Sequence, residues 1–158
     1  LQKFKDDHEK TQPICRIRPE FAAANPRYES WGLRDLCQSI HDFYKQYDVA
    51  RLTTEMYLSD MIPAMKPSDA FAKMAHRAIE RVAIEDLEGR ITAILLTPYP
   101  PGIPLLIPGE RFNKTIVDYL RFARDFNERF PGFETDVHGL VKREVDGKRG
   151  YFVDCVMQ

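Results

Sequence analysis

Residues 96–110 read LTPYPPGIPLLIPGE, and this stretch limits the kind of sheet that the chain can build. Five prolines lie within it, and a proline cannot donate a backbone hydrogen bond to a β-ladder. We therefore expect Pro98–Pro104 to be extended and irregular, or to form an edge strand. The apolar segments Ile91–Leu96 and Ile103–Ile107 flank these prolines. These apolar flanks favour a segment that crosses the fold and packs against its core. The alternative is a PxxP ligand for a groove like that of SH3 domains.

The segments on both sides of this stretch predict helices. Residues 31–47 and 114–130 carry apolar side chains at three- and four-residue steps, with Ser30 and Asn113 as expected N-caps and Pro131-Gly132 as the stop of the second. The positions expected to face inward are Leu33, Leu36, Cys37, Ile40, Phe43, Tyr44 and Tyr47 in the first helix, and Ile116, Tyr119, Leu120, Ala123, Phe126 and Phe130 in the second.

Two shorter helices are expected between them. One covers residues 49–59, and the other begins at Pro67-Ser68-Asp69 with Ser68 as its cap. The expected buried face of the latter comprises Phe71, Met74, Ala75, Ala78 and Ile79.

Strands are fewer and shorter. We expect them at Arg81–Ile84 and Ile91–Thr97, separated by a turn at Gly89. A closing hairpin joins Leu140–Val145 to Tyr151–Met157 through Asp146-Gly147. Helices and strands do not alternate as they would in a parallel sheet. The prediction is therefore an α+β fold, with helices packed on a small mixed or antiparallel sheet that ends in a β-hairpin.

The first thirty residues differ from the rest. Residues 1–12 are polar and helix-permissive and stop at Pro13, and residues 13–30 predict an irregular linker with one helical turn at Glu20–Ala24. The chain has no initiator Met, so it looks excised from something longer. We expect residues 1–30 to be a lead-in helix and linker from a preceding domain, and residues 31–158 to be one domain.

Composition excludes several classes of protein. A net charge of −1 argues against a nucleic-acid binder, and no apolar run reaches the roughly 20 residues that a membrane span needs. Cys15, Cys37 and Cys155 form no CxxC pair, so neither a disulfide framework nor a zinc site is expected. The prediction is a cytoplasmic protein with buried, reduced thiols, and without a nucleic-acid or membrane partner.

The residues carry no motif of a self-contained active site. There is no GxGxxG or GxxxxGK[ST] phosphate loop and no GxSxG nucleophile elbow. His138 is the best placed histidine, with Asp136 nearby, and a local Asp–His hydrogen bond is favoured over general-base work. The acidic residues Glu85, Asp86, Glu88 and Glu110 are expected in solvated turns. We predict no catalytic, cofactor-binding or metal-binding residue in this chain.

Four blocks resemble one family. Residues 96–110 and the segment Phe130–Gly139 resemble the two signatures of the prokaryotic ornithine/lysine/arginine decarboxylases, in their C-terminal domain. Residues 34–41 and Leu87–Ile91 are similar to further blocks of that domain. The four occur in the order of the family and cover nearly the whole chain, so residues 31–158 are identified as this C-terminal domain.

The resemblance implies a parent enzyme of fold type I that uses pyridoxal phosphate. Such enzymes convert arginine, lysine or ornithine to agmatine, cadaverine or putrescine with release of CO₂, in acid resistance and polyamine synthesis, and the cofactor serves as the electron sink. Their cofactor lysine follows a histidine in a Ser-x-His-Lys motif, which this chain lacks. The chain is thus expected to be inert alone, with a structural role and a place at the active-site entrance.

Partners and substrate also follow only from the resemblance. It implies contact with an upstream cofactor domain of the same polypeptide, and a homodimer that can assemble into a pentamer of dimers. Some lysine-type relatives bind the alarmone ppGpp through arginines, and Arg34 matches one of them. Asp6 and Pro13 stand where others align, so we expect Arg34 to be structural. Residues 51–57 and 111–115 favour the arginine- or lysine-acting branch.

Two further hypotheses come from other classes. The chain could be a stand-alone interaction module that binds a partner through Pro98–Pro104 or a helix face. It could also be a small enzyme centred on His138 and Asp136, which would require a pocket around His138.

Overall fold

The computed structural model describes residues 1–145 and 147–157. The chain forms two compact units. Unit 1 comprises Leu1–Val49 with Glu128–Glu134, and unit 2 comprises Ala50–Asn127 with Thr135–Gln158. The expected domain boundary between residues 30 and 31 stays a prediction, because packing units do not reveal where a preceding domain ends.

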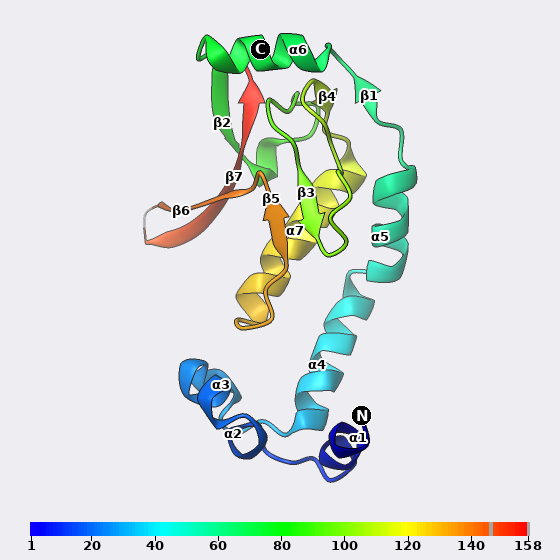
Figure 1. The fold of residues 1–158 in the computed structure, drawn as a ribbon, viewed down its shortest axis with the longest axis vertical. Coiled ribbons are helices and arrows are strands. Elements are labelled where there is room, and N and C mark those ends of the chain that lie inside the picture. Colours follow the sequence, from blue (N-terminus) through cyan, green and yellow to red (C-terminus); the bar gives the residue numbers. More distant parts are fainter. Residues whose placement is uncertain (146, 158) are drawn as a thin grey trace. The chain divides into compact units, whose positions relative to one another are not determined.

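Unit 1 is helical. It contains α1 (Gln2–Glu9), α2 (Ile14–Ile17), α3 (Pro19–Ala24), the 3₁₀ helix η1 (Pro26–Tyr28) and α4 (Leu33–Gln46). Figure 1 shows α1 and α2 near the N-terminal end of α4. The prediction of an irregular linker over residues 13–30 was wrong, apart from the helical turn expected at Glu20–Ala24, which lies within α3. Pro19 and Pro26 each occupy the first position of a helix, where the missing N–H has no partner to lose, so these prolines begin helices.

The start of α4 also differs from the prediction. Gly32 is the N-cap in place of Ser30, and the Asp35 carboxylate accepts a hydrogen bond from the Gly32 N–H at 2.9 Å. The Leu33 N–H donates to the Gln12 carbonyl at 2.9 Å, so a contact with an earlier segment sets where the helix begins. The expected apolar stripe is deeply buried only at its start: Leu33 and Leu36 are buried, while Tyr44 is exposed.

Unit 2 mixes helices with short antiparallel strands, which confirms the α+β prediction (Figure 1). One three-stranded sheet has the order β2-β7-β6, and two-stranded sheets pair β1 with β4 and β3 with β5. The helices are α5 (Val49–Leu58), α6 (Pro67–Ala75), η2 (Ile84–Asp86) and α7 (Lys114–Arg129). The strands are β1 (Ile62–Pro63), β2 (Ile79–Ala83), β3 (Thr97–Tyr99), β4 (Glu110–Arg111), β5 (Asp136–His138), β6 (Val141–Val145) and β7 (Lys148–Val156).

Helix α7 is confirmed in position and in its inner face. The Asn113 side chain caps it by accepting the Ile116 N–H at 2.9 Å. The six positions expected to face inward are all buried: Ile116, Tyr119, Leu120, Ala123, Phe126 and Phe130. Because these side chains lie three or four residues apart, they share one face and supply much of the core.

Two predictions for unit 2 were wrong. Residues 91–97 form no continuous strand, because their backbone bonds go to three different segments: residues 105–110, β7 and β5. In α6, Lys66 is the N-cap in place of Ser68. Ala70, not Phe71, is the side chain buried there, since Ala70 belongs to a cluster with Ile91, Ala93 and Val156, and Phe71 is 62% exposed.

The closing hairpin is confirmed, with Val141 opposite Phe152 and Val145 opposite Lys148. Tyr151, Val153 and Cys155 are buried as the alternation predicts, whereas Met157 follows β7 and is exposed. Of the expected turn, Gly147 adopts a positive φ and Asp146 lies outside the described residues.

The proline stretch packs into the core at both of its ends, as predicted. Leu96, Leu105 and Leu106 are fully buried, and Leu105 and Leu106 both donate their N–H groups to the Leu96 carbonyl. Between these residues, β3 pairs with β5, and the remaining prolines up to Pro104 are exposed. The prediction of an edge strand is thus confirmed for Pro98 and Tyr99, which lie in β3 of a two-stranded sheet.

Candidate functional site

His138 and Asp136 lie at the two ends of β5, and their side chains meet. The His138 Nε2 atom is 3.3 Å from an Asp136 carboxylate oxygen, and the Tyr99 ring lies 4.7 Å from the imidazole, centroid to centroid. The two polar side chains are 64% and 66% exposed. Both side chains are therefore open to solvent, unlike a typical general base, which lies in an enclosed pocket.

The acidic residues noted in the sequence lie on the surface or form contacts within the fold. Glu85, Asp86 and Glu88 are exposed in and after η2, and Glu85 forms an ion pair with Arg124. Glu110 accepts the Ile107 N–H at 2.8 Å. Among the described residues, no group of three or more His, Cys, Asp or Glu side chains is arranged to hold a metal ion.

The three thiols lie in different environments. Cys155 is fully buried, and burial raises its pKa to about 12. Cys37 is half-buried, and desolvation raises the pKa of its thiol as well. Cys15 is exposed, so the prediction that each cysteine is buried was wrong for this residue. Helix α2 turns Ile14 inward and thereby places its neighbour Cys15 on the surface.

The lysines of the described segment do not fit a pyridoxal phosphate site. A lysine that forms a Schiff base needs a desolvated pocket or a neighbouring cation to lower its pKa. Every lysine whose side chain the structure describes is exposed: Lys3, Lys5, Lys10, Lys45, Lys66, Lys73, Lys114 and Lys142. The expectation that this segment holds no catalytic or cofactor-binding residue stays a prediction.

Arg34 contacts the end of α1. Its guanidinium donates to the Glu9 carbonyl at 2.6 Å, across 25 residues of sequence. A cation at the carboxyl end of a helix also interacts favourably with the helix dipole. The contact is of the kind expected for a structural residue.

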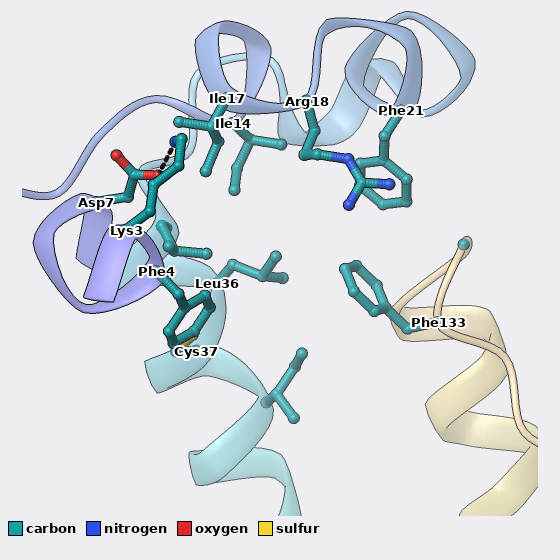
Figure 2. A pocket seen from close by; sticks show the side chains of 13 residues that line it. Lys3, Phe4, Asp7, Ile14, Ile17, Arg18, Phe21, Leu36, Cys37 and Phe133 are labelled. Carbon is teal, nitrogen blue, oxygen red and sulfur yellow. Dashed lines mark hydrogen bonds and ion pairs between the residues drawn. The ribbon is translucent and has the colours of Figure 1, made fainter. Parts of the chain in front are cut away.

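Unit 1 contains an apolar groove of about 550 Å³. Figure 2 shows side chains of α1, α2, α4 and the segment after α7 around one hollow. Its apolar walls include Ile14, Ile17, Phe21, Leu36, Cys37, Ile40 and Phe133. Of the lining residues, Ile14 and Leu36 are buried, whereas Phe4 and Phe133 are 54% and 39% exposed.

Three charged side chains lie at this groove. Lys3 and Asp7 form an ion pair with 2.5 Å between Nζ and the carboxylate oxygen, one turn apart on α1. Arg18 joins α2 to α3 and is exposed. Among residues 1–145 and 147–157, no hydrogen bond or ion pair of the Arg18 side chain is present.

Sequence reasoning missed this groove. The signal for part of it is present, because Ile14, Ile17 and Phe21 are spaced by three and four residues. Pro13 and Pro19 favour a linker by sequence pattern, but in the structure Pro13 is the N-cap of α2 and Pro19 begins α3. The contribution of Phe133 had no such signal, since it comes from a segment more than one hundred residues away in the sequence.

Comparison with known proteins identifies one family. Residues 50–157 match the family described as "Orn/Lys/Arg decarboxylase, C-terminal domain". The lysine decarboxylase LdcA of Pseudomonas aeruginosa is 43% identical over the whole chain, and the constitutive lysine decarboxylase of Escherichia coli is 35% identical over 93% of it. The biodegradative arginine decarboxylase of Escherichia coli is 33% identical over 99% of the chain.

The solved structures agree. Lysine decarboxylase A from Pseudomonas aeruginosa superposes with a TM-score of 0.90 over 99% of this chain. The constitutive lysine decarboxylase of E. coli gives a TM-score of 0.88 at 33% identity, also over 99%. The chain spans about a fifth of the length of these relatives, 22% in the case of LdcA. This chain therefore belongs to the ornithine/lysine/arginine decarboxylases and carries their C-terminal domain.

Proposed function

We propose that this chain is the C-terminal part of a pyridoxal-phosphate-dependent lysine decarboxylase. The observation that supports lysine is that two lysine decarboxylases, at 43% and 35% identity, exceed the arginine decarboxylase at 33% and two ornithine decarboxylases at 33% and 31%. The inducible lysine decarboxylase of E. coli is 30% identical, so the support comes from the first two enzymes alone. The product would be cadaverine, with arginine and agmatine as the next candidate pair.

In this proposal the cofactor supplies the electron sink for decarboxylation, and its lysine lies elsewhere in the parent polypeptide. The exposure of the described lysines supports a cofactor lysine outside this segment. The segment described here builds a buried core around α7 and contributes surface at the active-site entrance. Alone, it would neither bind the cofactor nor release CO₂.

The parent enzyme is proposed to be a cytoplasmic homodimer that can assemble into a pentamer of dimers. Within the described residues, no helix has the length and apolar composition needed to cross a membrane. The alternative of a stand-alone interaction module is not favoured, because the decarboxylase family match runs through Pro98–Pro104 and both flanking segments.

The test is expression of the complete reading frame and assay of CO₂ and diamine release from lysine, arginine and ornithine. We expect kcat/KM for lysine to exceed that for ornithine by about a hundredfold, the discrimination typical of substrates that differ by one methylene, and to exceed that for arginine as well. A preference for arginine would overturn the substrate assignment. Absence of decarboxylation with all three would overturn the proposed function itself.

A further inference from the structure

We propose that the groove of unit 1 binds an apolar segment that carries a carboxylate, supplied by another part of the parent polypeptide, and that this carboxylate pairs with Arg18. The inference rests on the proposed function, because it takes the chain as one part of a longer enzyme. The groove consists only of residues from unit 1.

The lining of the groove calls for an apolar occupant. Ile17, Phe21 and Ile40 are only half-buried, and Phe4 and Phe133 are exposed to a greater extent. Contiguous apolar surface of this kind, bordered by charged residues, is typical of an interaction site. Covering it removes apolar area from water, which is the main favourable contribution to association.

The charges at the groove narrow the chemistry further. Lys3 is already neutralised by Asp7, so Arg18 is the groove's unbalanced charge in the part of the chain that the structure describes. In Figure 2 the Arg18 guanidinium and the Phe21 ring lie at the same edge of the hollow, across from Phe133. A guanidinium matches a carboxylate with two parallel hydrogen bonds. A polyphosphate would require several cations, and the groove offers one that is not already paired.

The parent polypeptide is the source that the observations favour. Because the chain spans only about a fifth of the length of its relatives, most of such a polypeptide lies outside it. A tethered segment is present at a high effective concentration, so it occupies the groove ahead of a free partner of the same chemistry.

The cysteines provide the readout. Cys37 lines the groove, Cys15 lies exposed outside it, and Cys155 is fully buried. In the complete polypeptide, alkylation by iodoacetamide is followed for each cysteine by peptide mass spectrometry. We expect Cys37 to react more slowly than Cys15, and the Arg18→Glu variant to raise the Cys37 rate about tenfold, as expected for loss of one charge-assisted hydrogen bond.

Arg16→Glu is the matched control, because Arg16 is exposed on α2 and does not line the groove. It should leave the Cys37 rate unchanged, and Cys155 should stay unmodified in both variants as evidence of an intact fold. Equal Cys37 rates in wild type and Arg18→Glu would overturn the inference. A Cys37 rate that falls with rising protein concentration would also overturn it, in favour of a second copy as occupant.

The two proposals fail separately. A complete enzyme that decarboxylates lysine while Cys37 responds to neither variant would contradict only the inference. A responsive Cys37 in a polypeptide without decarboxylase activity would contradict only the proposed function.

Discussion

The side chain of Asn127 binds both backbone polar groups of Thr135. Its amide nitrogen donates to the Thr135 carbonyl at 2.9 Å, and its oxygen accepts the Thr135 N–H at 2.8 Å. Asn127 is 4% exposed and lies in α7, while Thr135 directly precedes β5. The pair therefore connects the end of the core helix to the start of β5, the strand that carries Asp136 and His138.

Replacing Asn127 with Ala should destabilise unit 2 by about 3 kcal/mol, because two hydrogen bonds are lost and two backbone groups lose their partner. Urea unfolding of the 158-residue chain measures the change in free energy. Glu128→Ala is the control, since Glu128 is the exposed neighbour and should change stability by less than about 0.5 kcal/mol. Equal effects of the two substitutions would contradict the bridging role of Asn127.

The cap of α7 gives a second prediction. Asn113 accepts the Ile116 N–H and donates to Ser59 at 3.0 Å and to the Asp60 carbonyl at 3.2 Å. Asn113→Ala should therefore cost about 1–2 kcal/mol. Ser30→Ala should cost almost nothing, because Ser30 is not the N-cap of α4. Thermal unfolding of the two variants compares them directly, and a larger loss for Ser30→Ala would show that the assigned caps are wrong.

Substitutions at two glycines with positive φ distinguish the cost of backbone strain from the cost of a steric clash. A Cβ at Gly89 meets no heavy atom within 4 Å, whereas one at Gly109 would lie 2.5 Å from the Met65 carbonyl oxygen. Gly89→Ala should cost about 1 kcal/mol from the left-handed backbone alone. Gly109→Ala should cost clearly more, since backbone must move. The urea concentrations at the midpoint of unfolding compare the two variants. Equal midpoints would argue against the close contact between Gly109 and the Met65 carbonyl oxygen.

The buried thiol of Cys155 predicts a dependence of stability on pH. Its pKa is about 12 in the folded chain, above the ordinary value of 9.0, because burial disfavours the thiolate. The unfolded chain therefore releases this proton first as the pH rises above 9. The contribution to stability is complete below pH 9 and falls by at most about 1.4 kcal/mol per pH unit toward pH 12.

The Cys155→Ala variant isolates this effect. Its free energy of unfolding should be lower at neutral pH, because a buried side chain is truncated, and should decline less steeply above pH 9 than that of the wild type. Cys15→Ala serves as the comparison, since Cys15 is exposed. Parallel curves for wild type and Cys155→Ala between pH 9 and 11 would contradict the raised pKa.

Some of this molecule could be read from local sequence. The Asn113 cap, the inner face of α7 and the β6–β7 hairpin were all predicted, because periodicity, capping and turn residues act within a few positions of each other. The same holds for membership of the family, since its signatures are continuous segments. In these cases local preference and tertiary packing point to the same structure.

Only the tertiary structure decided where distant segments compete for the same backbone groups and the same buried space. It divided the hydrogen bonds of residues 91–97 among three partners, moved the start of α4 to Gly32, and buried Ala70 in place of Phe71. It also brought Phe133 to the groove of Ile17 and Arg18, and Thr135 to Asn127. Such contacts depend on the path of the whole chain, and no local pattern of residue types records that path.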